Sequence, residues 1–212
     1  MFPIRDLIHR RHFPVINWLI IVANFIVFFH ELAVPNFNVF VDEYALIPAH
    51  FHWLSLDSYK YIIYSMFIHG GWFHIGSNMW FLHVFGDSVE DRLGHIFYLL
   101  FYLIAGFAAA FFQLLFSLGS TIPMIGASGA IAGVLGAYIV LFRQSRIQTL
   151  IFFIIILDII YLPAWLFIGY WFLIQAFSGL GTLATFDVNQ GGVAYFAHIG
   201  GFIFGYLLVG RL

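Results

Sequence analysis

Residues 124–133 read Met-Ile-Gly-Ala-Ser-Gly-Ala-Ile-Ala-Gly, which places Ser128 among glycines and alanines at the head of an apolar run. A polar, potentially nucleophilic side chain at membrane depth is costly, so Ser128 is a candidate functional residue. Glycine, alanine and serine are also the residues from which helix contacts in lipid are built, and Gly129 and Gly133 form a small-xxx-small step. This stretch alone favours helix packing over catalysis, and the rest of the chain decides between them.

The composition of the chain identifies the class of protein. Of 212 residues, 63% are apolar and only 8% are charged, and the mean hydropathy is +0.98. A soluble domain of this size needs far more charged side chains on its surface, so we predict an integral membrane protein. The chain has no cysteine, which excludes disulfides and thiolate chemistry. The apolar composition implies a lipid bilayer as the surroundings, whereas the net charge of −2 identifies no partner, and we expect no nucleic acid.

The hydropathy pattern predicts one all-α membrane domain over residues 1–212, a bundle of six transmembrane helices. Arginines precede the first apolar run, which lacks a cleavage-site pattern, so we interpret it as a retained span. A break is expected at Gly70-Gly71, inside the second run. The fifth run is longer than one span needs and is divided by Pro163, so we expect one long or kinked helix whose first part lies near the interface. The predicted spans are about 15–32, 61–85, 96–116, 122–142, 149–177 and 193–209.

The basic residues orient the six spans. Lys60 lies on one side of the membrane in this topology, and all seven arginines lie on the other. Basic residues concentrate on the cytoplasmic side, so both termini are expected to be cytoplasmic. Glu90-Asp91-Arg92 is expected to be a solvated turn at this side, with Glu90 capping or pairing. The arginines are Arg5, Arg10, Arg11, Arg92, Arg143, Arg146 and Arg211.

Four polar residues share one depth in this topology. His74 and Asn78 are four residues apart, so both project from one face of the second span. Ser128 opens the fourth span and His198 opens the sixth, both on the outer side. Packing residues have no reason to agree in depth, so we predict that these four side chains form one site just below the outer surface.

The motifs around these residues resemble the rhomboid family of intramembrane serine proteases. They are His-Gly-Gly-Trp-Phe-His-Ile-Gly-Ser-Asn over residues 69–78, Gly-Ala-Ser-Gly over 126–129 and Ala-His-Ile-Gly-Gly over 197–201. The resemblance covers nearly the whole chain, in the family's order. It implies a serine endopeptidase of six helices that cuts transmembrane protein substrates near the membrane surface.

The resemblance also implies a role for each of the four residues. Ser128 matches the nucleophile and His198 the general base of a dyad, while His74 and Asn78 match side chains that stabilise the oxyanion. No acidic third member matches a family motif. Some members stack the histidine on a tyrosine four residues after the serine. Ala132 stands there in this chain, so another residue must support the His198 ring.

Two other function classes share parts of this pattern. A catalytically inactive rhomboid-like protein would bind transmembrane helices without cutting them, although this chain retains both members of the dyad. A channel or transporter would need polar residues to continue toward the inner side, where these spans are nearly all apolar. We expect no cofactor and no metal, because no His-Glu-x-x-His is present. The short architecture favours a bacterial plasma membrane, and the sequence leaves the oligomeric state open.

Overall fold

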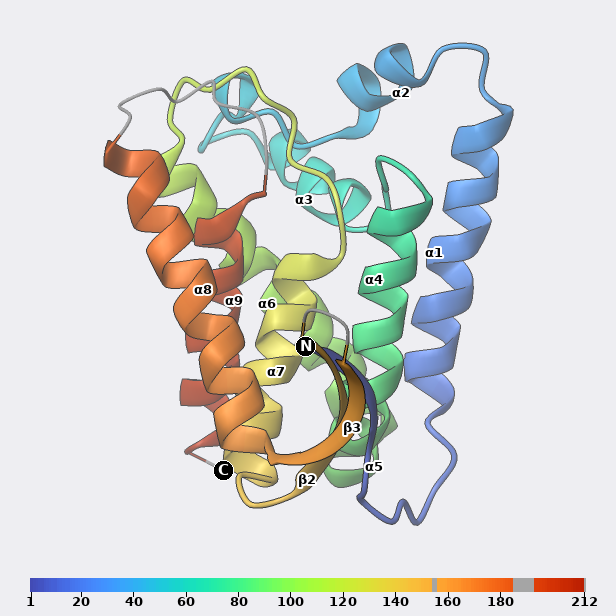
Figure 1. The fold of residues 1–212 in the computed structure, drawn as a ribbon. Helices are drawn as coiled ribbons and strands as arrows, with labels where there is room; N and C mark the ends of the chain where they lie inside the picture. Colours follow the sequence, from blue (N-terminus) through green and yellow to red (C-terminus); the bar gives the residue numbers. More distant parts are fainter. Residues whose placement is uncertain (154–155, 185–192, 212) are drawn as a thin grey trace.

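A computed structural model describes residues 1–153, 156–184 and 193–211. Figure 1 shows a helical bundle with a small sheet packed on one side of it. The strands are β1 (Phe2–Asp6), β2 (Arg146–Phe153) and β3 (Ile156–Pro163), and short turns are η1 (Pro48–His50) and η2 (Leu56–Tyr59). The helices are α1 (Val15–Ala33), α2 (Phe37–Tyr44), α3 (Lys60–Ser65), α4 (Trp72–Phe81), π-helical η3 (Leu82–Gly86), α5 (Asp87–Leu93), α6 (His95–Phe116), α7 (Ser128–Leu141), α8 (Ala164–Ala184) and α9 (Tyr195–Val209).

Three of the described helices, α1, α6 and the 164–182 part of α8, are long and apolar enough to cross a membrane. Helices α7 and α9 are apolar but shorter. The expected break is present, because α4 begins at Trp72 after Gly71, which has a φ of 146°. Helices α4, η3 and α5 then follow one another without interruption.

Helix α7 lies at the centre of the bundle, where every residue from Gly129 to Tyr138 is buried. It packs on α6 and α9, and glycines set the distance to α9. A Cβ on Gly201 would lie 2.1 Å from the carbonyl oxygen of Gly129, and one on Gly205 would lie 2.0 Å from that of Gly133. The glycine faces of the two helices therefore pack with backbone against backbone.

The fifth predicted span is wrong in its first part. Residues expected to begin a helix at 149 form β2 and β3, and α8 begins only at Ala164. The strands form an antiparallel sheet with β2 between β1 and β3. Isoleucine and aromatic side chains occur in both segments and favour strands over helices. The fold is therefore mostly helical with a small sheet, and not all-α.

The expectation of a solvated turn is wrong at Glu90, whereas the expected capping by Glu90 is confirmed. The Glu90 side chain is completely buried. Its carboxylate accepts hydrogen bonds from the backbone N–H groups of Ile16 (2.9 Å) and Asn17 (2.6 Å) in the first turn of α1. These N–H groups have no partner within their helix, so Glu90 caps α1 from a different helix.

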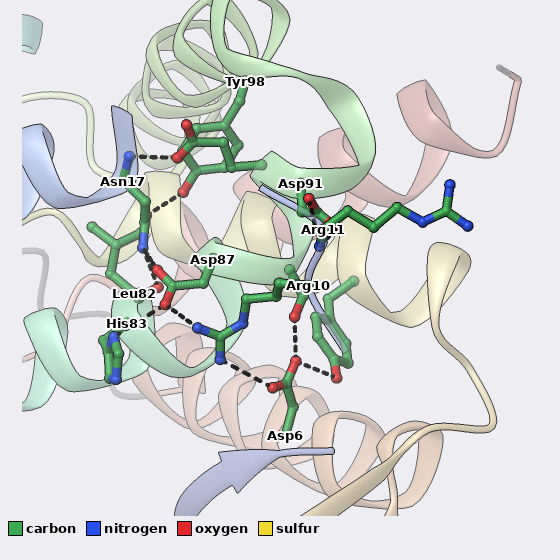
Figure 2. Close-up of polar contacts among 12 residues, drawn as sticks. Asp6, Arg10, Arg11, Asn17, Leu82, His83, Asp87, Asp91 and Tyr98 are labelled. Carbon is green, nitrogen blue, oxygen red and sulfur yellow. Dashed lines mark hydrogen bonds and ion pairs between the residues drawn. The ribbon is translucent and has the colours of Figure 1, made fainter. Parts of the chain in front are cut away.

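Polar side chains, most of them buried, join the N-terminal segment to α1 and α5. Arg10 donates to Asp87 (2.6 Å) and to Asp6 (3.4 Å), as Figure 2 shows. Asn17 donates to the other oxygen of Asp87 (2.7 Å) and accepts from the Tyr98 hydroxyl (2.5 Å). We call these five residues the arginine cluster. It connects the N-terminal segment and the start of α1 to α5 and the start of α6.

Candidate functional site

A non-helical segment positions Ser128 at the start of α7. The backbone N–H of Met124 donates to the carbonyl oxygen of Leu46, and that of Gly126 donates to Ser65, each at 2.8 Å. Gly126 has a φ of 113°, a region that side chains disfavour. Because these contacts fix the segment, α7 begins inside the bundle, well below the end at which α2 and α3 lie (Figure 1). Ser128 is half-buried there.

The structure brings His198 to Ser128, 70 residues away in the chain. The Nε2 atom of His198 lies 2.7 Å from the Oγ atom of Ser128. His198 is one helical turn before Gly201, so the close approach of α9 to α7 brings the two side chains together. The start of α9 is also fixed from α6, because the backbone N–H of Ala197 donates to Gln113 (3.0 Å).

Helix α8 contributes two residues that the sequence analysis missed. The Oε1 atom of Gln175 lies 2.7 Å from Nδ1 of His198, and both side chains are buried. The ring of Trp171 lies beside the imidazole, with centroids 5.8 Å apart and planes inclined by 36°. Helix α8 thus supports the His198 ring, which Ala132 cannot do in place of the tyrosine of other family members. A lone amide in an apolar helix was the available signal for Gln175.

His74 faces the same site from α4. The backbone N–H of Gly70 donates to its Nδ1 atom (3.3 Å). An imidazole nitrogen that accepts a hydrogen bond carries no proton, so the proton of neutral His74 lies on Nε2. A Cβ on Gly126 would lie 2.7 Å from that nitrogen. The glycine therefore makes room for the ring beside the segment that leads into Ser128.

Asn78 presents a buried donor with no partner. Within the described part of the chain, its Nδ2 atom makes no hydrogen bond. It lies near His74, because both atoms are close to the position of a Cβ on Gly126. An unpaired buried amide costs free energy, so a native structure that retains one calls for an explanation.

These side chains line one cavity of about 620 Å³. Ser128, His198, His74 and Asn78 all contribute to its wall, together with Trp171. The cavity thus gathers the four residues that the sequence analysis placed at one depth. A hydroxyl, an imidazole within hydrogen-bond distance and two further N–H donors are the groups that nucleophilic acyl transfer requires.

Comparison with known proteins identifies the family. Residues 57–212, more than half of the chain, match the model of the Rhomboid domain. "Rhomboid protein 1, mitochondrial" of Saccharomyces cerevisiae is 31% identical over 172 residues, which are 79% of this chain and 45% of that protein. "RHOMBOID-like protein 4" of Arabidopsis thaliana is 36% identical over 141 residues, 66% of this chain and 31% of that protein.

The match covers only part of each of these relatives. This chain spans less than half the length of either protein. Both come from eukaryotes, so they give no support to the expected bacterial plasma membrane. Together with the apolar helices, the match to the family model establishes a membrane protein. The chain belongs to the rhomboid family.

Proposed function

We propose that this protein is an intramembrane serine endopeptidase that cleaves transmembrane protein substrates near the outer membrane surface. The observation that carries the proposal is the 2.7 Å contact between Ser128 Oγ and His198 Nε2 in a cavity that also holds an unpaired Asn78 donor. A structural role for Ser128 and His198 would not require that donor to remain unpaired.

The acylation step uses the Ser128–His198 dyad. The Ser128 oxygen attacks the carbonyl carbon of the scissile bond while His198 Nε2 takes the hydroxyl proton. The tetrahedral intermediate then collapses, the C–N bond breaks, and the imidazolium returns the proton to the leaving amine. The acyl group remains on Ser128. Water attacks this ester in the second step, with His198 again as the base, and releases the serine.

The negative oxygen of the intermediate requires hydrogen-bond donors that are already in place. Asn78 Nδ2 and His74 Nε2–H are two such donors. The Ser128 backbone N–H is the third, because the first N–H groups of a helix have no partner within it and the positive end of the helix dipole favours a negative charge.

The proposed topology has six crossing segments, α1, the continuous run of α4 and η3, α6, α7, α8 and α9. Both termini are cytoplasmic in this arrangement. Arg143 and Arg146 follow the end of α7 opposite to Ser128, which agrees with an outer site and a basic inner side.

Labelling with a fluorophosphonate probe tests the function without knowledge of the substrate. We expect the purified protein in detergent to be labelled, and Ser128→Ala and His198→Ala to abolish labelling while both variants remain folded. A folded wild-type protein that is not labelled, or a Ser128→Ala variant labelled as strongly as wild type, would contradict the proposal. The first of these results would favour the catalytically inactive helix-binding protein.

A further inference from the structure

The contact between His198 and Gln175 restricts which ring nitrogen carries the proton. The Oε1 atom of an amide is an acceptor and has no proton to give. A neutral imidazole has one N–H, and the 2.7 Å contact with Oε1 requires it on Nδ1. The lone pair of Nε2 then points at the Ser128 hydroxyl, 2.7 Å away. This is the tautomer that a base toward Ser128 needs.

The position of Gln175 on α8 agrees with a specific role. Trp171 is four residues before Gln175, so both side chains project from one face of the helix. The Trp171 ring lies beside the His198 ring, and Gln175 contacts its Nδ1 atom. An amide buried at membrane depth costs free energy unless it is bonded, and the contact with His198 supplies that bond.

We propose that Gln175 is a positioning residue, a neutral third member that holds His198 in the tautomer and orientation needed to activate Ser128. The proposal rests on the proposed proteolysis. Gln175 acts through His198 and does not touch the reacting atoms. A glutamine orients the ring as a carboxylate would, but it adds no charge beside the imidazole.

The difference in charge between glutamine and glutamate allows a specific test by pH dependence. Gln175→Glu retains the acceptor and places a negative charge beside the ring, which favours the imidazolium. The other titratable side chain facing His198 from a described helix is His74 of α4. The labelling rate should fall at acidic pH, and we expect this fall to occur about one pH unit higher in Gln175→Glu than in wild type.

Gln175→Leu removes the acceptor with little change in volume. We expect the inactivation rate constant for the fluorophosphonate to fall about tenfold, while the concentration for half-saturation stays the same. At pH values above this shifted fall, Gln175→Glu should label at the wild-type rate. Gln144→Leu and Gln144→Glu are matched controls, because Gln144 is exposed beyond the other end of α7, and they should label as wild type does.

Nitrogen NMR of ¹⁵N-histidine-labelled protein in detergent tests the tautomer independently of catalysis. The His198 signals are assigned by their loss in His198→Ala. We expect protonated Nδ1 in wild type and Gln175→Glu, and a mixture of tautomers in Gln175→Leu. Unprotonated Nδ1 in wild type, or Gln175 variants with wild-type rates and pH profiles, would overturn the proposal. Absence of wild-type labelling with the expected NMR result would instead overturn the proteolysis and retain the contact.

Discussion

Two asparagines, Asn17 and Asn78, are both buried, but their side-chain amides differ in hydrogen bonding. Asn17 in the arginine cluster is fully satisfied: its amide donates to Asp87 and to the carbonyl oxygen of Leu82 (2.9 Å), and its oxygen accepts from Tyr98 (Figure 2). The amide nitrogen of Asn78 has no partner within the described ranges. The same side chain thus completes a network at one end of the bundle and leaves a donor unused at the other.

This difference in hydrogen bonding distinguishes side chains that stabilise the fold from side chains that act in the reaction. A satisfied buried network contributes to folding, and removing one member leaves the others unpaired at a cost of about 1–3 kcal/mol or more. A donor that is unpaired in the resting protein contributes nothing to folding and can bind a charge that forms only during a reaction. Mutations in the two clusters should therefore affect different measurements.

Asn78→Ala should have the largest effect, and only on the reaction. Loss of one oxyanion donor typically lowers the rate by about 10²–10³, or about 2.7–4 kcal/mol. We expect this fall in the rate of substrate cleavage with no loss in the free energy of unfolding, because the amide nitrogen has no partner to lose. Asn24→Ala in α1, a buried asparagine that does not line the cavity, is the matched control for the rate. Equal losses of stability and rate in Asn78→Ala would contradict the distinction.

Asp87→Ala should have the opposite profile. It leaves the Arg10 guanidinium and the Asn17 amide without their carboxylate. Breaking a buried ion pair costs about 3–5 kcal/mol, and because 30% of the Arg10 side chain remains exposed we expect about 3 kcal/mol. Unfolding in mixed detergent measures the loss, and the labelling rate per folded molecule should be unchanged. Asp158→Ala on β3, an exposed aspartate, is the control.

The sequence predicted that Ser128, His198, His74 and Asn78 lie together, as they do around one cavity, but it did not predict the arginine cluster. Ser128, His198, His74 and Asn78 lie in short motifs rich in glycine, and each motif opens or interrupts an apolar run, so depth and residue type were both visible. Gln175 was missed because it stands alone in α8, and the rotation of that helix decides what an isolated amide faces. The contact with His198 depends on packing and not on local pattern.

The arginine cluster was missed for a related reason. Arg10 and Asp87 are 77 residues apart, and charges at the ends of spans are ordinarily exposed at the interface. Hydropathy also gave the wrong secondary structure over residues 149–163, because an averaged apolar run does not distinguish a buried helix from a hairpin. The frequency of β-branched residues between Ile147 and Ile160 was the signal that favoured strands.

Tyr98→Phe should sharpen the comparison within the arginine cluster itself. The variant leaves the Asn17 oxygen without its donor, and we expect a loss of about 1.5 kcal/mol in the free energy of unfolding. Tyr102 provides a matched control one helical turn away. It is also completely buried, but its hydroxyl has no partner in the part of the chain that the structure describes. Tyr102→Phe should therefore leave stability unchanged, and a similar loss in both variants would contradict the assigned network.

Asp91 lies beside the arginine cluster at the protein surface and should give the smallest effect. Partial burial raises the pKa of its carboxyl, but hydrogen bonds from the backbone N–H groups of Arg11 and His12 and from the His12 ring outweigh it and lower the pKa below 3.8. A carboxyl with a lowered pKa stabilises the fold above its unfolded pKa, and this contribution is lost as the pH falls through the folded value. We therefore expect wild type to exceed Asp91→Asn in stability by less than about 1 kcal/mol near neutral pH. The difference should shrink as the pH falls below 3.8. Unfolding midpoints of both proteins across this range measure it, and a difference that grows on acidification would show that Asp91 is not held as a carboxylate.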